Sequence, residues 1–123
     1  TENNVASIIE ENNTGNLIAD NAVRYINEHY SDDITLSELA CLSGVSPQYF
    51  DRIFRERLNM RPMEYIARVK ISKAKSMLLD SDISVTQLSK SLGYTGPTYF
   101  GIVFKKYEGI SPSEFRKNGG SVI

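Results

Sequence analysis

Residues 45–54 read VSPQYFDRIF, and residues 96–104 read GPTYFGIVF. In both stretches a Tyr-Phe pair is followed by a second Phe, four residues after the first. Apolar residues three and four positions apart lie on one face of a helix, and proline is favoured at the first helical position. The two stretches therefore predict two copies of one amphipathic helix, near 47–58 and 97–107.

The likeness continues on both sides of these stretches. The offset between matching positions is 49 residues, and it becomes 50 after one extra residue in the second turn. The matching pairs are Ile34 with Ile83, Leu36 with Val85, Leu39 with Leu88, Gly44 with Gly93, Tyr49 with Tyr99, Phe50 with Phe100, Phe54 with Phe104, Pro62 with Pro112, Glu64 with Glu114 and Tyr65 with Phe115. Each copy thus predicts a short helix, a turn with glycine, a second helix and a third helix opened by proline. This order is the layout of a helix-turn-helix with a supporting helix.

Hydrophobic periodicity and helix-start signals extend this interpretation to the rest of the chain, where no alternating strand pattern occurs. We expect helices over 17–30, 34–44, 47–58, 62–79, 85–92 and 97–107, and a last one opened by Ser111-Pro112. The expected fold is all-α, with two helix-turn-helix subdomains, a long connector helix and about seven helices. The expected division is a linker or frayed segment over 1–16, a first subdomain over 17–61, the connector over 62–79, a second subdomain over 80–118 and a tail over 119–123.

Composition limits the classes of protein that need to be considered. A chain of 123 residues with 41% apolar content can bury one modest core or two small ones. It has neither an apolar run of about 18 residues nor a secretion signal, so we expect a cytoplasmic protein without a membrane partner. Cys41 and His29 are the only residues of their kinds, so we expect no disulfide and no metal site. Cys41 is expected to be a small packing residue.

The net charge of −1 averages two unlike parts. Residues 1–33 hold one Arg against seven carboxylates, a balance of −6, whereas residues 34–123 hold 13 Lys and Arg against eight carboxylates, a balance of +5. A basic body suits a polyanion, although mixed charge is also ordinary solvated surface. The chain has no phosphate-binding loop, metal-ligand motif or Ser-His pairing, so we expect no enzyme, no catalytic residue and no cofactor.

The first copied helix has an outer face suited to nucleic acid. Its apolar side chains are expected to pack on Leu36, Leu39 and Ala40, which leaves the opposite face to Gln48, Asp51, Arg52 and Arg55. In the major groove, Arg pairs with guanine and Gln with adenine, and backbone N–H groups at a helix N-terminus can hold a phosphate. Any amphipathic helix has a polar outer face, and the duplicated motif is what favours base recognition.

The expected connector helix has a length close to the spacing of major-groove faces on DNA. If residues 62–79 are helical throughout, they form a helix about 27 Å long. Successive major-groove faces on one side of DNA lie about 34 Å apart. One connector helix could therefore hold two recognition helices near groove spacing and replace the dimer that most single helix-turn-helix proteins need.

Two longer strings carry a family resemblance. They are LACLSGVSPQYFDRIFRERLNMRPMEYIARVKISKAKSML and GYTGPTYFGIVFKKYEGISPSEFRK. Over about residues 17–117 the chain resembles the DNA-binding domain of the AraC/XylS family of bacterial transcription regulators, in which a long helix joins two helix-turn-helix units. The second string is the more specific, because its Tyr-Phe, Phe-Lys-Lys, Gly, Ser-Pro and Phe-Arg elements follow the family's order and spacing.

The resemblance implies that the second helix of each unit is the recognition helix. The base-facing positions that it implies are Gln48, Asp51 and Arg52 in the first unit and Thr98, Gly101 and Ile102 in the second. The phosphate-facing residues are expected to be Ser46, Arg55, Arg61, Lys105 and Lys106.

Four residues depart from the family's pattern. Gly101 and Ile102 stand where the family often has a polar and then a basic residue. Ile102 would pack on a neighbouring domain, remain exposed or contact thymine methyl groups, and of these we favour contact with DNA. Lys70 stands where the connector commonly has Arg, and Tyr94 stands where the second turn commonly has Phe.

The resemblance implies a sequence-specific DNA-binding domain of a bacterial transcription regulator of the activator type. It would read two adjacent major-groove segments with the helices near 47–58 and 97–107. The expected partners are double-stranded DNA, RNA polymerase and an N-terminal effector or dimerisation domain outside this chain. The alternative is a helical protein-interaction module without specific DNA binding.

Overall fold

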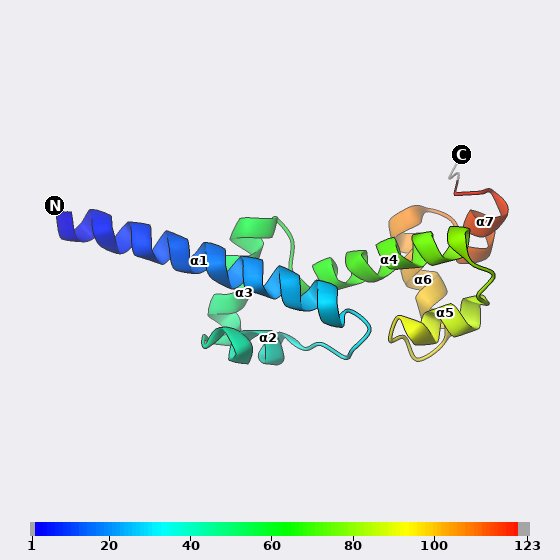
Figure 1. Ribbon diagram of the computed structural model, residues 1–123, viewed down its shortest axis with the longest axis horizontal. Helices are drawn as coiled ribbons and strands as arrows, with labels where there is room; N and C mark the ends of the chain where they lie inside the picture. Colours follow the sequence, from blue (N-terminus) through cyan, green and yellow to red (C-terminus); the bar gives the residue numbers. More distant parts are fainter. Residues whose placement is uncertain (1, 121–123) are drawn as a thin grey trace. The chain divides into compact units, whose positions relative to one another are not determined.

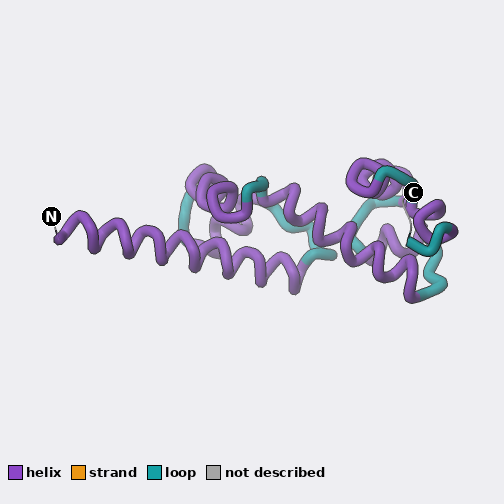
Figure 2. The backbone as a smooth tube through the Cα atoms, turned by 90° about the horizontal axis from the view of Figure 1, so that it is seen from above, coloured by secondary structure: helices purple, strands orange, loops and turns teal. Residues whose placement is uncertain are grey.

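The computed structural model describes residues 2–120, with side chains from Thr14 onward. Within this range the chain forms helices and no strands (Figures 1 and 2). The helices are α1 (Glu2–His29), α2 (Leu36–Ser43), α3 (Pro47–Leu58), α4 (Pro62–Asp80), α5 (Val85–Ser91), α6 (Pro97–Glu108) and α7 (Pro112–Lys117). The all-α fold is confirmed. α1 begins well before the expected residue 17, whereas the expected bounds from α2 to α6 agree with the structure to within two residues.

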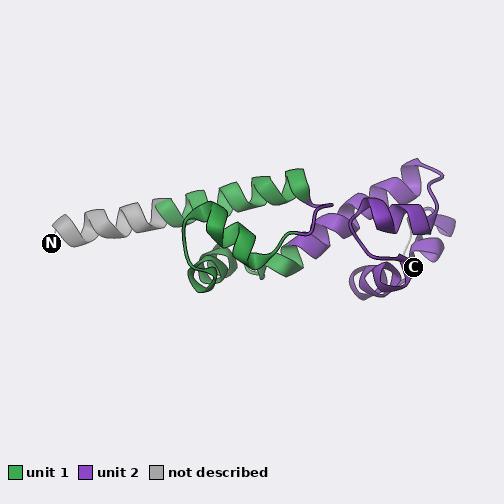
Figure 3. Ribbon diagram, turned by 90° about the horizontal axis from the view of Figure 1, so that it is seen from below, with its two compact units in different colours: residues 1–29, 34–65 green, residues 30–33, 66–123 purple. Residues whose placement is uncertain are grey.

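The chain divides into two compact units (Figure 3). Unit 1 comprises residues 1–29 and 34–65, and unit 2 comprises residues 30–33 and 66–123. The boundary falls inside α4, whose first turn belongs to unit 1. The five-part division expected from the sequence remains a prediction, because the side chains of its N-terminal segment up to residue 13 and residues 121–123 of its tail lie outside the described residues.

Unit 1 is held together by the apolar faces of α1, α2 and α3, which contact one another pairwise. The buried apolar side chains of these helices and the loop before α2 are Ile18, Ala19, Ala22, Ile26, Ile34, Leu39, Ala40, Phe50, Ile53 and Phe54. The ring centroid of Phe54 lies 5.8 Å from that of Phe50 and 5.7 Å from that of Tyr65 in the first turn of α4. The expected burial of Phe50 and Phe54 on the inner face of α3 is confirmed, and the outer face of α3 is left free for other contacts.

Among the helices whose starts lie within the described side chains, four begin with a hydroxyl cap. The capping oxygens belong to Thr35, Ser46, Ser84 and Ser111, and each accepts a hydrogen bond from the backbone N–H three residues later. Such caps satisfy an N–H that the helix itself leaves without a partner, and each is worth about 1 kcal/mol. α6 is different because Gly96 stands at its N-cap and provides no side-chain hydrogen bond.

Unit 2 repeats the aromatic packing of unit 1. Its core is formed by Ile71, Ala74 and Leu78 of α4 with Leu88, Leu92, Phe100, Phe104 and Phe115. The ring centroid of Phe104 lies 5.9 Å from that of Phe100 and 5.5 Å from that of Phe115, so α6 and α7 share one aromatic row. The same two Phe positions therefore anchor α3 and α6, each to its own core.

The loop before α2 meets the turn after α5 at a close backbone contact. Gly93 has φ +90°, and a Cβ atom there would collide with the carbonyl oxygen of Ser31. The Lys70 ammonium lies 4.9 Å from the centroid of the Tyr94 ring beside this contact. Burial lowers the pKa of Lys70, although Asp33 opposes this shift, and burial also raises the pKa of Tyr94 to about 12. Lys70 and Tyr94 thus contact each other beside the turn after α5.

Cys41 corrects one expectation. The sequence predicts a small packing residue, but the Cys41 side chain is exposed and its thiol is free. The buried positions of α2 are instead the neighbouring Leu39 and Ala40. On a helix of eight residues the core takes only a narrow stripe, and Cys41 lies outside it.

The described residues show neither a membrane-spanning helix nor a cluster of metal-ligating side chains. None of their helices combines the length and apolar character that crossing a bilayer requires. No three of their His, Cys, Asp or Glu side chains gather in a group suited to a metal ion.

Candidate nucleic-acid interface

The outer face of α3 carries the polar residues that the sequence singled out. Gln48, Arg52 and Arg55 are exposed, and Asp51 is half-buried. Gln48, Arg52 and Arg55 are spaced four and three residues apart, so they lie together on the side of α3 away from the buried Phe50 and Phe54, and Asp51 lies at the edge of that side. The structure therefore brings the first set of expected base-facing residues together on one helical face.

Two contacts hold the charged side chains on this face. Asp51 and Arg55 form an ion pair in which Asp51 Oδ2 is 2.9 Å from Arg55 Nε, and the Arg52 guanidinium lies over the Tyr49 ring, 5.0 Å from its centroid. Arg52 Nε is also 4.0 Å from a Glu56 carboxylate oxygen, but both of these side chains are more than half exposed, so that ion pair contributes little. The stacked ring is the stronger constraint on the direction of the guanidinium.

Ser46 lies at the N-terminus of α3, which is suited to an anion. Its hydroxyl oxygen accepts from the Tyr49 N–H at 3.1 Å, and Ser46 itself is exposed. The first turn of a helix offers backbone N–H groups and the positive end of the helix dipole. Arg61, an exposed residue in the loop before α4, supplies a further cation in the same unit.

The corresponding face of α6 is much less polar. Thr98 and Ile102 are exposed, and Gly101 is half-buried. Apart from its chain neighbours and the backbone of its own helix, no described atom lies within 4 Å of the place where a Cβ of Gly101 would stand. Lys105 and Lys106 are exposed in the last turn of α6. The second set of expected residues therefore also shares one helix, with its cations at the C-terminal end only.

Tyr99 is an exposed residue of this face that sequence reasoning missed. Its side chain is 59% exposed, close to the 62% of Ile102, and the two are three residues apart on α6. A signal was present in the sequence, because Tyr precedes the buried Phe in both copies and so lies beside the core rather than in it. The equivalent Tyr49 is half-buried.

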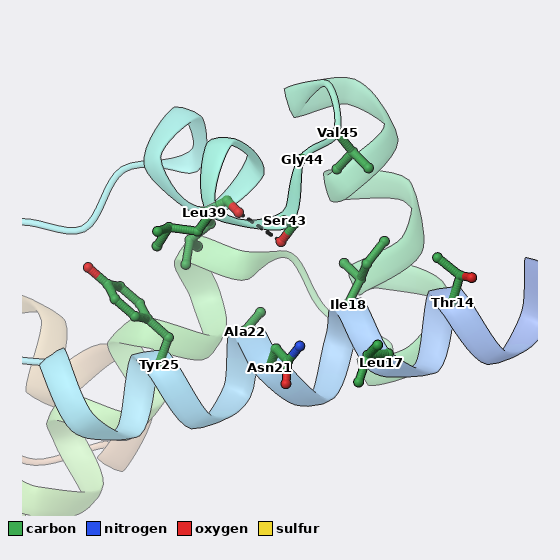
Figure 4. Close-up of a pocket in the computed structure, with 11 residues that line it drawn as sticks. Thr14, Leu17, Ile18, Asn21, Ala22, Tyr25, Leu39, Ser43, Gly44 and Val45 are labelled. Atoms are coloured by element: carbon green, nitrogen blue, oxygen red, sulfur yellow. Dashed lines mark hydrogen bonds between the residues drawn. The ribbon is translucent and has the colours of Figure 1, made fainter.

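A separate apolar groove opens in unit 1 between α1 and α2 (Figure 4). Its volume is about 530 Å³, and Leu17 and Leu42, at its rim, are 60% and 62% exposed. Its polar lining comes from Thr14, Asn21, Tyr25 and Ser43. No Lys or Arg lines this groove and it includes no residue of α3, so it is distinct from the outer face of that helix.

The amino-acid sequence is similar to those of known transcription regulators. Residues 39–118 match a family model described as a helix-turn-helix domain. The chain is 34% identical over 100 residues to the HTH-type transcriptional regulator YisR of Bacillus subtilis, a match that covers 81% of this chain and 35% of YisR. It is 31% identical over 112 residues to the Msm operon regulatory protein of Streptococcus mutans, covering 90% of this chain and 40% of that protein. The chain thus spans well under half the length of these curated relatives.

Solved structures with the same fold include two that come from regulatory proteins. The C-terminal domain of AraT, a response regulator from Geobacillus stearothermophilus, superposes with a TM-score of 0.80 at 30% identity, covering 82% of this chain and 84% of that one. The DNA-binding domain of the transcription factor AdpA, solved in complex with a target DNA, superposes with a TM-score of 0.78 at 25% identity, covering 81% and 90%.

Proposed function

Because the chain belongs to the AraC-type family of helix-turn-helix transcription regulators, we propose that α3 and α6 each enter a major-groove segment of one duplex. The observation that carries this proposal is the outer face of α3, where Gln48 and Arg52 are exposed on the side opposite the buried phenylalanines. A helix presents side chains to base edges in this way when it lies in the major groove.

The exposed residues of this interface fall into two groups, those assigned to base edges and those assigned to phosphates. Arg52 is assigned to guanine O6 and N7, Gln48 to adenine N6 and N7, and Asp51 to an amino group such as cytosine N4. On α6, Thr98, Gly101 and Ile102 are assigned to base edges. The phosphate contacts are assigned to Ser46, Arg55, Arg61, Lys105 and Lys106, which position the protein without selecting sequence.

Membership of the family also supports a proposal about partners and location. We expect RNA polymerase as a partner in transcription activation, an N-terminal effector or dimerisation domain outside this chain, and a cytoplasmic location in a bacterium. Two recognition helices in one chain let this domain occupy a site as a monomer.

The test is binding of residues 1–123 to duplex DNA over a range of salt concentrations. Each phosphate contact releases condensed counterions, so the logarithm of the binding constant should fall linearly with the logarithm of salt concentration. Fluorescence anisotropy with a labelled duplex selected from a random pool gives the slope, and sedimentation gives the stoichiometry. No retention of DNA at low salt would contradict the proposal.

The alternative, a protein-interaction module, has one observation in its favour. The groove between α1 and α2 is apolar, with Leu17 and Leu42 exposed at its rim. The same titration separates the two functions, because an interaction module would show no salt-dependent affinity for duplex DNA.

A further inference from the structure

The repeated tyrosine has different surroundings in the two units. Tyr49 on α3 is half-buried and lies under the Arg52 guanidinium. Tyr99 on α6 is 59% exposed, and the position that corresponds to Arg52 is Ile102, which is itself 62% exposed. The first tyrosine supports a charged side chain, and the second presents its own ring to solvent.

The Tyr99 ring is nevertheless held in place from one side. Its centroid lies 6.0 Å from that of Tyr94 in an edge arrangement, and Tyr94 in turn lies under the Lys70 ammonium. Aromatic pairs of this geometry are stabilised beyond their buried area. One edge of Tyr99 is therefore anchored while the rest of the ring remains available for a contact.

Gly101 leaves open space on the opposite side of Ile102 from Tyr99. A Cβ at Gly101 would meet no described atom within 4 Å beyond its chain neighbours and the backbone of its own helix. A helix without a side chain at this position can bring its backbone closer to a groove floor. The face thus combines a ring, an aliphatic side chain and a gap, with no charged or amide side chain among them.

We propose that Tyr99 and Ile102 form an apolar surface that recognises the C5-methyl group of thymine, which makes Tyr99 a further specificity-determining residue. This inference rests on the proposed function, since it requires α6 to lie in the major groove. The methyl group is the one apolar feature that base pairs present in that groove, and apolar side chains are its natural contacts. The second recognition helix would then select thymine by shape and burial rather than by hydrogen bonds.

The test replaces thymine by deoxyuridine, which removes only the methyl group. A duplex selected from a random pool is synthesised with each thymine replaced in turn, and affinity for residues 1–123 is measured by anisotropy. One or two replacements opposite α6 should weaken binding by about fourfold, the worth of burying one methyl-sized apolar group. Equal affinity for every replaced duplex would overturn the inference.

Three variants assign the effect to side chains. In Tyr99→Ala and in Ile102→Ala the preference for thymine over deoxyuridine should fall below about twofold at those positions. Leu42→Ala is the matched control, because Leu42 is as exposed as Ile102 but lies on α2, and it should keep the full preference. A full preference in Tyr99→Ala would remove Tyr99 from the site.

The experiment distinguishes failure of methyl recognition from failure of DNA binding itself. Tight, salt-dependent binding that ignores the methyl group contradicts this inference alone, whereas no DNA binding by the unsubstituted chain contradicts the proposed function as well. Circular dichroism melts establish that each variant is folded. The deoxyuridine series uses the unsubstituted chain, so it tests methyl recognition even where a variant is unstable.

Discussion

Arg52 and Ile102 occupy the same position in the two copies of the motif. Because one side chain is charged and the other is apolar, we expect them to contact DNA differently, and single substitutions can test this. The Arg52 guanidinium lies 5.0 Å from the centroid of the Tyr49 ring. Stacking restricts a planar, always charged group to fewer directions, so less conformational entropy is lost when it pairs with a base. Arg52 is thus prepared for a directed, bidentate contact.

Arg52→Ala should therefore lower the affinity for the preferred duplex by about 1–3 kcal/mol and relax the preference at one base pair. Affinities for a set of duplexes, each with one base pair changed, measure both effects. An equal loss on every duplex would show that Arg52 contacts a phosphate.

Lys105→Ala should instead weaken binding to all sequences alike and reduce the salt slope by about one, because a phosphate contact carries no sequence information. Lys73→Ala is the matched control, since Lys73 is also an exposed lysine but lies on α4 outside the assigned contacts. A change of base preference in Lys105→Ala would mean that this lysine reaches a base edge.

At the scale of helices and turns, local signals were sufficient to predict most of the structure. The caps at Ser46 and Ser111 were predictable because a hydroxyl and the N–H that it satisfies are only three residues apart. The contact of Gly93 with Ser31 was not, because its partners lie 62 positions apart and meet only in the folded unit. The exposure of Cys41 and Tyr99 also escaped prediction, since periodicity locates the centre of an apolar face better than its edge.

The turn after α5 predicts that alanine substitutions at two glycines differ in their effect on stability. Gly93 and Gly109 both have positive φ, +90° and +86°, but only at Gly93 would a Cβ collide with another residue. Gly109→Ala should lower the free energy of unfolding by about 1–2 kcal/mol, the cost of a left-handed backbone with a side chain. Gly93→Ala should cost about 1–3 kcal/mol more, because the Ser31 backbone must move.

Urea unfolding followed by circular dichroism measures both changes. The difference between the two variants isolates the close approach of Ser31, since the conformational penalty is common to them. Equal stabilities would show that the loop before α2 moves away from the turn at little cost.

For the whole molecule, the sequence predicted what both copies share better than what distinguishes them. Phe50 and Phe54 repeat as Phe100 and Phe104 because each helix must pack on a core of the same design, and these positions are fully buried in both units. The outer positions are not constrained by the core, so Gln48, Asp51 and Arg52 could diverge from Thr98, Gly101 and Ile102. The pairing of Asp51 with Arg55 and of Arg52 with Tyr49 required coordinates, because many rotamers are open to exposed side chains.

This divergence leads to a prediction about the DNA site as a whole. Sites selected from a random pool should contain two parts centred about 10 base pairs apart, one for each recognition helix. The part opposite α3 should show strong base preferences, because Arg and Gln can pair bidentately with bases. The part opposite α6 should be weaker and lean toward thymine, because apolar contact and DNA shape discriminate less sharply.

Moving the two parts relative to each other tests whether one chain reads both. Inserting about five base pairs between them turns the second part to the opposite face of the duplex, so affinity should fall to that for the first part alone. Inserting about ten base pairs restores the face but not the distance, and should not restore affinity if α4, one uninterrupted helix from Pro62 to Asp80, joins the two recognition helices as a stiff connector. Undiminished affinity with either insertion, or equal information in both halves of the selected site, would contradict recognition of a bipartite site by two unlike helices of one chain.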